Sequence, residues 1–240
     1  MIRETDKTKL REYCSQNPNG LSPEQLDKIC AEMEHPKEKT ITDEYLDFTL
    51  WCRGMPSRQE SFAAYIEKEF PATKGKRILE VGGGIHGRLS LLLAEKSYRM
   101  TCMDPELELD GDGNEYRSLP DRSRNLSHSD SQTGAKVEFR KELFDYRAVD
   151  LSGYDCVVGQ EPCEATEHIV RACTIQSVPF MVLLCGVPHR LITGELPDDV
   201  WAWYRYLREI DPEHTVMELV DLYGLVNTAM IRSKKDIFEQ

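Results

Sequence analysis

The chain has 240 residues, of which 40% are hydrophobic and 30% are charged, and these proportions exclude a disordered or membrane-spanning class. Its longest apolar run, residues 178–187, is shorter than the roughly 18 residues of a membrane span. The net charge of −12 disfavours nucleic acids and anionic membrane surfaces as partners, because proteins that bind them present basic surfaces. Residues 1–7 are charged and lack the apolar stretch of a signal peptide, so we expect a cytoplasmic protein without structural disulfides.

The first third of the chain has the periodicity of helices. Ser57 and Glu60 form a capping box that opens one helix, and Pro71 ends it. The apolar spacing predicts helices over residues 22–34, 43–53 and 57–70. We therefore predict a helical extension over residues 1–74, followed by the main domain over residues 75–240.

The periodicity changes after Lys76. Residues 77–81 form a short apolar strand, a glycine cluster follows it directly, and residues 89–95 and 98–103 are typical of a helix and a second strand. This strand–loop–helix–strand unit opens a doubly wound α/β sheet.

The elements that follow complete an alternating α/β pattern. A polar segment over residues 105–135 occupies the place of a crossover helix and is predicted to be a flexible insertion. Further strands are expected over residues 136–140, 154–159, 179–185, 215–222 and 227–232, and helices over residues 165–174 and 198–210. The last two strands are predicted to form an antiparallel pair.

The glycine cluster has the form of a nucleotide-binding loop. Gly82, Gly84 and Gly87 fit the pattern G-x-G-x-x-G between a strand and a helix, which lets the backbone approach a ligand closely. Asp104 ends the second strand, 20 residues beyond Gly84 (104 − 84), where its carboxylate can accept hydrogen bonds from ribose hydroxyls. This arrangement predicts either a nicotinamide cofactor or S-adenosylmethionine (SAM).

Residues 77–105, RILEVGGGIHGRLSLLLAEKSYRMTCMDP, resemble motif I through the second strand of class I SAM-dependent methyltransferases. The resemblance implies a doubly wound, mostly parallel, seven-stranded Rossmann-like sheet with a reversed final strand. An acid before the first glycine, as found here, is usual in that family, whereas His86 departs from its pattern. The resemblance implies SAM as cofactor and the cofactor-binding residues Glu80, Gly82, Gly83, Gly84, Asp104, Glu142 and Leu143.

The loop at residues 160–167 follows the fourth strand, at the edge of the sheet where ligands bind in such folds. Glu161 and Glu164 are therefore candidate catalytic residues, as a general base or as acids that orient the substrate. Residues 154–189 are similar to a less common pattern found in some tRNA 2′-O-methyltransferases, but Glu161 stands where that pattern often has histidine.

Two other chemistries are disfavoured at this loop. Pro162 and Cys163 are similar to the nucleophile motif of cytosine-C5 methyltransferases, but the neighbouring carboxylates would raise the pKa of the thiol. Cys163, Cys185 and His189 lack the spacing of metal ligands, so we expect no metal.

The leading hypothesis is a SAM-dependent methyltransferase for a small-molecule or peptide acceptor, with the N-terminal helices as a lid. The alternatives are a tRNA methyltransferase, an NAD(P)-dependent oxidoreductase, and a SAM-binding module that has lost catalysis. Arg58 either reaches the SAM carboxylate or a substrate acid, or is a solvated arginine in the first turn of its helix.

Overall fold

The computed structural model describes residues 9–10, 12–13, 29, 43–71, 75–107, 137–185, 200–223 and 228–234. Most of the helix predicted over residues 22–34 and most of the insertion predicted over residues 105–135 lie outside the described residues. Within the described part of the chain, no helix is long and apolar enough to cross a membrane.

Two helices of the N-terminal extension are described, α3 (Asp43–Cys52) and α4 (Arg58–Glu69). The predicted capping box at the start of α4 is confirmed, because the Ser57 amide donates to Glu60 Oε2 at 2.6 Å and the Glu60 amide donates to Ser57 Oγ at 3.2 Å. These bonds satisfy amides that have no partner inside the helix and fix where α4 begins.

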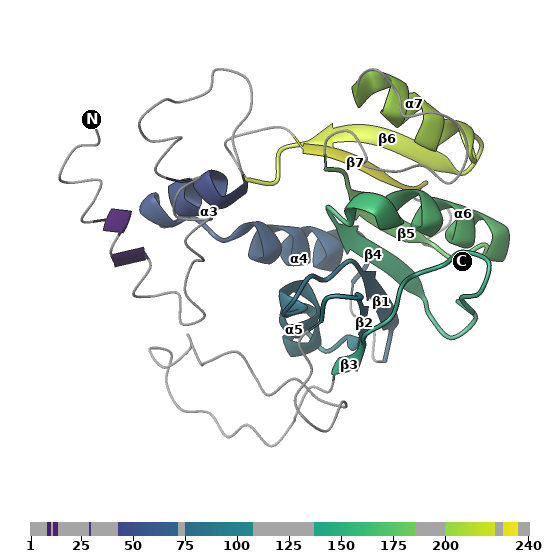
Figure 1. Cartoon of the computed structure of the whole chain (residues 1–240), viewed down its shortest axis with the longest axis horizontal. Coiled ribbons are helices and arrows are strands. Elements are labelled where there is room, and N and C mark those ends of the chain that lie inside the picture. The colour runs from purple at the N-terminus through teal and green to yellow at the C-terminus, as the bar shows by residue number, and fades with distance from the viewer. Residues whose placement is uncertain are drawn as a thin grey trace.

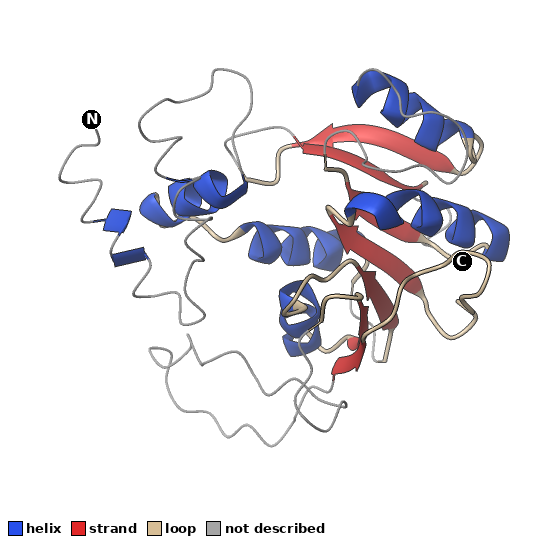
Figure 2. Cartoon of the chain, in the orientation of Figure 1, coloured by secondary structure: helices blue, strands red, loops and turns tan. Residues whose placement is uncertain are grey.

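The main domain is one seven-stranded sheet with the order β3-β2-β1-β4-β5-β7-β6 (Figures 1 and 2). The strands β1 to β5 pair in parallel, whereas β7 is antiparallel to both β5 and β6. The strands are β1 (Arg77–Val81), β2 (Arg99–Met103), β3 (Val137–Arg140), β4 (Cys156–Gln160), β5 (Phe180–Leu183), β6 (Thr215–Val220) and β7 (Thr228–Ser233). The helices of this domain are α5 (Arg88–Glu95), α6 (Thr166–Gln176) and α7 (Val200–Glu209).

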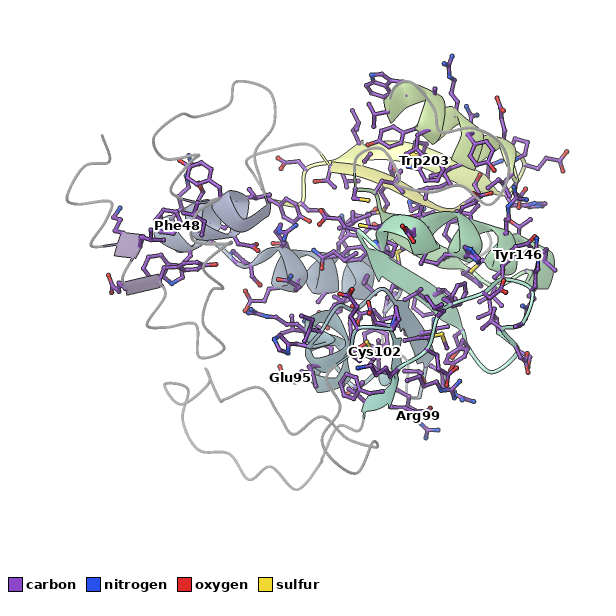
Figure 3. The ribbon with its side chains drawn as sticks, in the orientation of Figure 1. Phe48, Glu95, Arg99, Cys102, Tyr146 and Trp203 are labelled. Carbon is purple, nitrogen blue, oxygen red and sulfur yellow. The ribbon has the colours of Figure 1, made fainter. Side chains whose placement is uncertain are left out.

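Both faces of the sheet are covered by helices, as expected for buried parallel strands. Successive residues of a strand point to opposite faces, so Ile78 and Leu79 of β1 belong to different apolar clusters. One cluster joins the sheet to α4 and α5 through Phe62, Ile66, Leu89 and Leu93. The other joins it to α6 and α7 through Ile169, Val170, Trp203 and Leu207, with Trp203 labelled in Figure 3.

The helical extension is packed unevenly. The side chains of α4 share one core with the sheet, whereas α3 lies farther from the sheet (Figure 1) and packs Phe48 against Tyr13 and Ile29. The helix α4 is thus part of the core of the main domain. The division of the chain at residue 74 stays a prediction.

The predicted strands and helices of the main domain are confirmed within a few residues at each end. The connection from β3 to β4, residues 141–155, contains turns and no helix. The strand order reverses between β1 and β4, since β1 continues to β2 on one side while β4 continues to β5 on the other. Open α/β sheets bind ligands at the carboxyl ends of the strands beside such a reversal.

Candidate cofactor and acceptor site

The glycine loop follows β1 and adopts a backbone that favours glycine. Gly82 has φ +74° and Gly84 has φ +65°, both in the left-handed region. A Cβ atom at Gly82 would lie 2.6 Å from Pro162 Cβ, whereas a Cβ atom at Gly84 would meet no atom within 4 Å. The loop is thus packed against the protein at Gly82 and open to a ligand at Gly84.

Asp104 lies directly under this loop at the end of β2. It is 8% exposed, and its Oδ2 accepts a hydrogen bond from the Gly84 amide at 2.9 Å. Its Oδ1 accepts one from the Glu106 amide at 2.7 Å. Because each carboxylate oxygen has two lone pairs, both oxygens can accept a further bond from a ribose hydroxyl. The predicted pairing of glycine loop and acid is therefore present as a contact.

Glu80 is buried under the same loop but faces the first turn of α5. Its Oε2 accepts hydrogen bonds from the amide, at 2.8 Å, and from the hydroxyl of Ser90. Burial raises the pKa of Glu80 to about 7, although both bonds from Ser90 oppose that rise. Its contacts fix α5 against β1, and direct contact with the cofactor stays a prediction.

Gly83 is close to the side chains beneath the loop. A Cβ atom there would overlap Cys102 Sγ and lie 3.2 Å from Glu80 Cδ. Cys102 of β2, labelled in Figure 3, is fully buried and contacts Ser90 of α5, and burial raises the pKa of its thiol well above the usual value. Only glycine fits at position 83 without moving these groups.

Glu142 and Leu143 follow β3 and are both exposed, Leu143 by 79%. They line an open cavity of about 390 Å³ that extends along the connection from β3 to β4 to Arg77 at the start of β1, and the glycine loop and Asp104 are not part of its lining. An exposed leucine beside a carboxylate offers apolar contact and a hydrogen-bond acceptor, which suits a purine ring. Their role at the adenine of the cofactor stays a prediction.

The loop after β4 packs onto the glycine loop. Pro162 fills the space beside Gly82, and a Cβ atom at Gly159 of β4 would lie 2.9 Å from Pro162 Cγ. The Glu161 amide donates to the carbonyl of Leu183 at 3.0 Å, and both Glu161 (φ +54°) and Cys163 (φ +42°) have left-handed backbone. The loops that follow β1 and β4 are therefore in direct contact.

Arg58 connects this loop to the helical extension. Its Nη1 lies 2.7 Å from Glu161 Oε2, and its Nε and Nη2 donate to the two carboxylate oxygens of Asp47 at 2.9 and 3.2 Å. The residue is only 7% exposed, so its interpretation as a solvated arginine is wrong. The guanidinium binds carboxylates from α3 and from the loop after β4 at once.

The two candidate catalytic acids differ in their surroundings. Glu161 Oε2 accepts the bond from Arg58 at 2.7 Å, so this carboxylate is already paired with a cation. Glu164 is exposed in the short helical turn Cys163–Ala165. Catalytic roles for both stay predictions, with orientation of the substrate favoured for Glu161.

Some residues of this region were not identified from the sequence. Asp47 and Ser90 are ordinary helix residues by pattern, and only the folded chain brings them to Arg58 and Glu80. Near the same loop, the buried side chains of Tyr223 and Gln160 lie close to each other. Among all the residues that the structure describes, no group of three or more His, Cys, Asp or Glu side chains could hold a metal ion.

Comparison with known proteins gives weak likenesses of fold. No protein-family model and no curated protein matches the chain. A solved SAM-dependent methyltransferase from Aquifex aeolicus is 14% identical, with a TM-score of 0.42 over 81% of this chain and 98% of that chain. The plantazolicin methyltransferase BpumL in complex with SAH is 11% identical, with a TM-score of 0.44 over 88% of this chain and 96% of that chain.

The order and direction of the strands identify the fold. The first five strands have the order and parallel pairing of a doubly wound nucleotide-binding sheet. The reversed β7 between β5 and β6 is the feature that the sequence resemblance implied. The chain therefore has the fold of the class I SAM-dependent methyltransferases.

Proposed function

We propose that the chain binds SAM and transfers its methyl group to an acceptor. The observation that carries this proposal is the bond between the Gly84 amide and Asp104, which joins the glycine loop of β1 to the acid of β2. The residues present fit the cofactor, since Gly84 has open space for a ligand and Asp104 retains acceptor capacity for a ribose.

The cofactor supplies an activated methyl group on a sulfonium that already carries a good leaving group. The protein therefore has to bind the cofactor and the acceptor, align them and exclude water. It needs no nucleophile of its own. Gly82, Gly83 and Gly84 let the backbone approach the methionine part of the cofactor. Asp104 accepts hydrogen bonds from the hydroxyls of its ribose. Glu142 and Leu143 border the adenine.

The acceptor is expected at the loop after β4, beside the glycine loop. Glu161 is held by Arg58 and orients a donor group of the acceptor, while the exposed Glu164 is available to accept a proton. The extension that carries Arg58 covers this loop as a lid. A small molecule or a peptide suits the net charge of −12 better than RNA does.

An NAD(P)-dependent oxidoreductase is the competing activity for a glycine loop of this form. The dinucleotide-binding sheet has the strand order 3-2-1-4-5-6 without a reversed strand. The observed insertion of β7 between β5 and β6 favours SAM over a nicotinamide cofactor. A SAM-binding module without catalysis would bind the cofactor in the same way but would transfer no methyl group.

Transfer of label from methyl-labelled SAM to metabolite, peptide and tRNA pools tests the proposal. The native chain and Glu95→Ala, a control at the exposed end of α5 (Figure 3), are expected to label a small-molecule or peptide fraction. Asp104→Ala is expected to label nothing. Labelling confined to tRNA would contradict the proposed acceptor class, and binding without labelling of any pool would contradict catalysis.

A further inference from the structure

Two cysteine side chains meet at the edge of the proposed acceptor site. Cys163 Sγ and Cys185 Sγ lie 3.6 Å apart, although the residues are 22 positions apart in the sequence. Cys163 is exposed on the turn after β4, and Cys185 is partly buried just beyond the end of β5. Both are thiols in the structure.

This separation is small enough for the two sulfurs to be joined. The S–S bond of a disulfide is about 2.05 Å long, so one sulfur has to move by about 1.5 Å. Cys163 belongs to a three-residue turn outside the sheet, where such a movement disturbs no strand pairing. Cys185 directly follows Leu184, whose amide donates to the carbonyl of Ala229 in β7 at 2.9 Å.

The other cysteines of the main domain that the structure describes lie in different surroundings. Cys102, Cys156 and Cys173 are fully or almost fully buried in the two apolar clusters. An external disulfide therefore cannot reach these three thiols. Within the described sheet and its helices, Cys163 is exposed and also has a second thiol nearby, that of Cys185.

We propose that Cys163 and Cys185 form a thiol–disulfide exchange site for low-molecular-weight disulfides of the glutathione type. Glu161 and Glu164 keep the ionised fraction of Cys163 small, so the first step is expected to be slow. In it, Cys163 loses its proton to water and the thiolate attacks one sulfur of glutathione disulfide, which forms a mixed disulfide on Cys163 and releases one glutathione thiolate. The Cys185 thiolate then attacks Cys163 Sγ, forms the bond between the two residues and releases the second glutathione. The protein loses two protons and two electrons, and one glutathione disulfide is reduced to two glutathione molecules.

The surroundings assign the order of the two steps. Cys163 is exposed and meets the external disulfide first, whereas Cys185 is only partly exposed. The hydrogen bond with Cys163, burial and the charge of Glu161 raise the pKa of Cys185 well above the usual value, and Tyr204 of α7 lies close enough to interact with it. The second step is therefore slow at neutral pH, and the mixed disulfide accumulates before the internal bond forms.

A bond at this position would tie the acceptor loop to the sheet. Pro162 between Glu161 and Cys163 packs on Gly82, and Glu161 binds Arg58, so the bond would fix the segment that touches both the cofactor loop and the lid. In a reducing compartment such a disulfide is transient, which is typical of redox-sensing pairs.

Intact-mass measurement and peptide mapping of the reduced full chain after incubation with glutathione disulfide test the proposal. The native chain is expected to lose two hydrogens and to yield one linked peptide pair that contains Cys163 and Cys185. Absence of that pair, or equally fast linkage between other cysteines, would overturn the proposal, and this result depends on no variant.

Three variants separate the two roles. Cys185→Ser is expected to stop at the mixed disulfide and to retain one glutathione on Cys163. Cys163→Ser is expected to react at least about tenfold more slowly at Cys185, because the accessible thiol is gone. Cys52→Ser, on α3, is the control and is expected to behave like the native chain. A glutathione adduct on Cys185 at the native rate in Cys163→Ser would contradict the assigned order.

Discussion

Arg58 and Glu161 lie 103 positions apart in the sequence, yet Arg58 Nη1 and Glu161 Oε2 are 2.7 Å apart in the folded chain. The same guanidinium binds both carboxylate oxygens of Asp47. One buried cation thus holds the extension, through α3 and α4, to the loop that follows β4. This side chain therefore links α3, α4 and the loop after β4.

Replacement of this cation is expected to destabilise the fold. Arg58→Ala leaves two partly buried carboxylates without their cation, so the free energy of unfolding should fall by about 2 to 3 kcal/mol. Urea unfolding of the variant and the native chain measures this difference. Lys68→Ala, on the exposed side of the same helix, should change stability little, because the Lys68 side chain is 77% exposed. Equal midpoints for the native chain and Arg58→Ala would contradict a structural role for the ion pairs.

The stability of the chain should depend on pH through Glu80. Its pKa is about 7 in the folded chain and lies near the ordinary 4.5 in the unfolded chain, because burial disfavours the charged form. Between these values unfolding releases a proton, so the stabilisation is full below about pH 4.5 and is lost as pH rises through about 7.

Glu80→Gln removes this titration and keeps an acceptor for Ser90. The free energy of unfolding of the variant minus that of the native chain should rise by on the order of 3 kcal/mol as pH increases from 4.5 to 8. Urea titrations of both proteins at several pH values measure the gain. A pH-independent difference between the two would show that the carboxyl does not titrate in this range.

Gly82 and Gly84 should respond differently to alanine. At Gly82 the new methyl group meets Pro162 and the backbone is left-handed, so Gly82→Ala should lose about 2 to 4 kcal/mol of stability. At Gly84 only the backbone is strained, and the loss should be about 1 kcal/mol.

Ligand affinity should be sensitive to alanine at Gly84, although stability there is not. The methyl group of Gly84→Ala projects into the space proposed for the cofactor, so affinity for S-adenosylhomocysteine should fall at least about tenfold despite the small change in stability. Thermal unfolding and calorimetric titration of the two variants give both quantities. Native affinity in Gly84→Ala would place the ligand elsewhere.

The sequence predicted the features that follow from local patterns. Strands β1 and β2, the capping box at Ser57, and the juxtaposition of Gly84 with Asp104 depend on periodicity, cap residues and the register of adjacent parallel strands. The reversed β7 was predicted because the final strands resembled those of a known class of sheet. These features need little knowledge of how distant segments pack.

The contacts that escaped prediction are long-range. Nothing in the sequence around Arg58 shows that it meets Asp47 and Glu161, because helical periodicity places a residue on a face without naming what covers that face. The approach of Cys163 to Cys185 has the same cause, since it depends on the adjacency of β4 and β5 and on the left-handed turn between Glu161 and Cys163.

Calorimetric titration with S-adenosylhomocysteine, SAM, NAD and NADP tests the central claim most directly. The native chain and Glu95→Ala should bind S-adenosylhomocysteine, and Asp104→Ala should bind it at least about tenfold more weakly, because two hydrogen bonds from the ribose to a carboxylate are lost. Binding of NAD or NADP alone, or equal affinity for S-adenosylhomocysteine in Asp104→Ala and the native chain, would contradict a SAM site at Gly84 and Asp104.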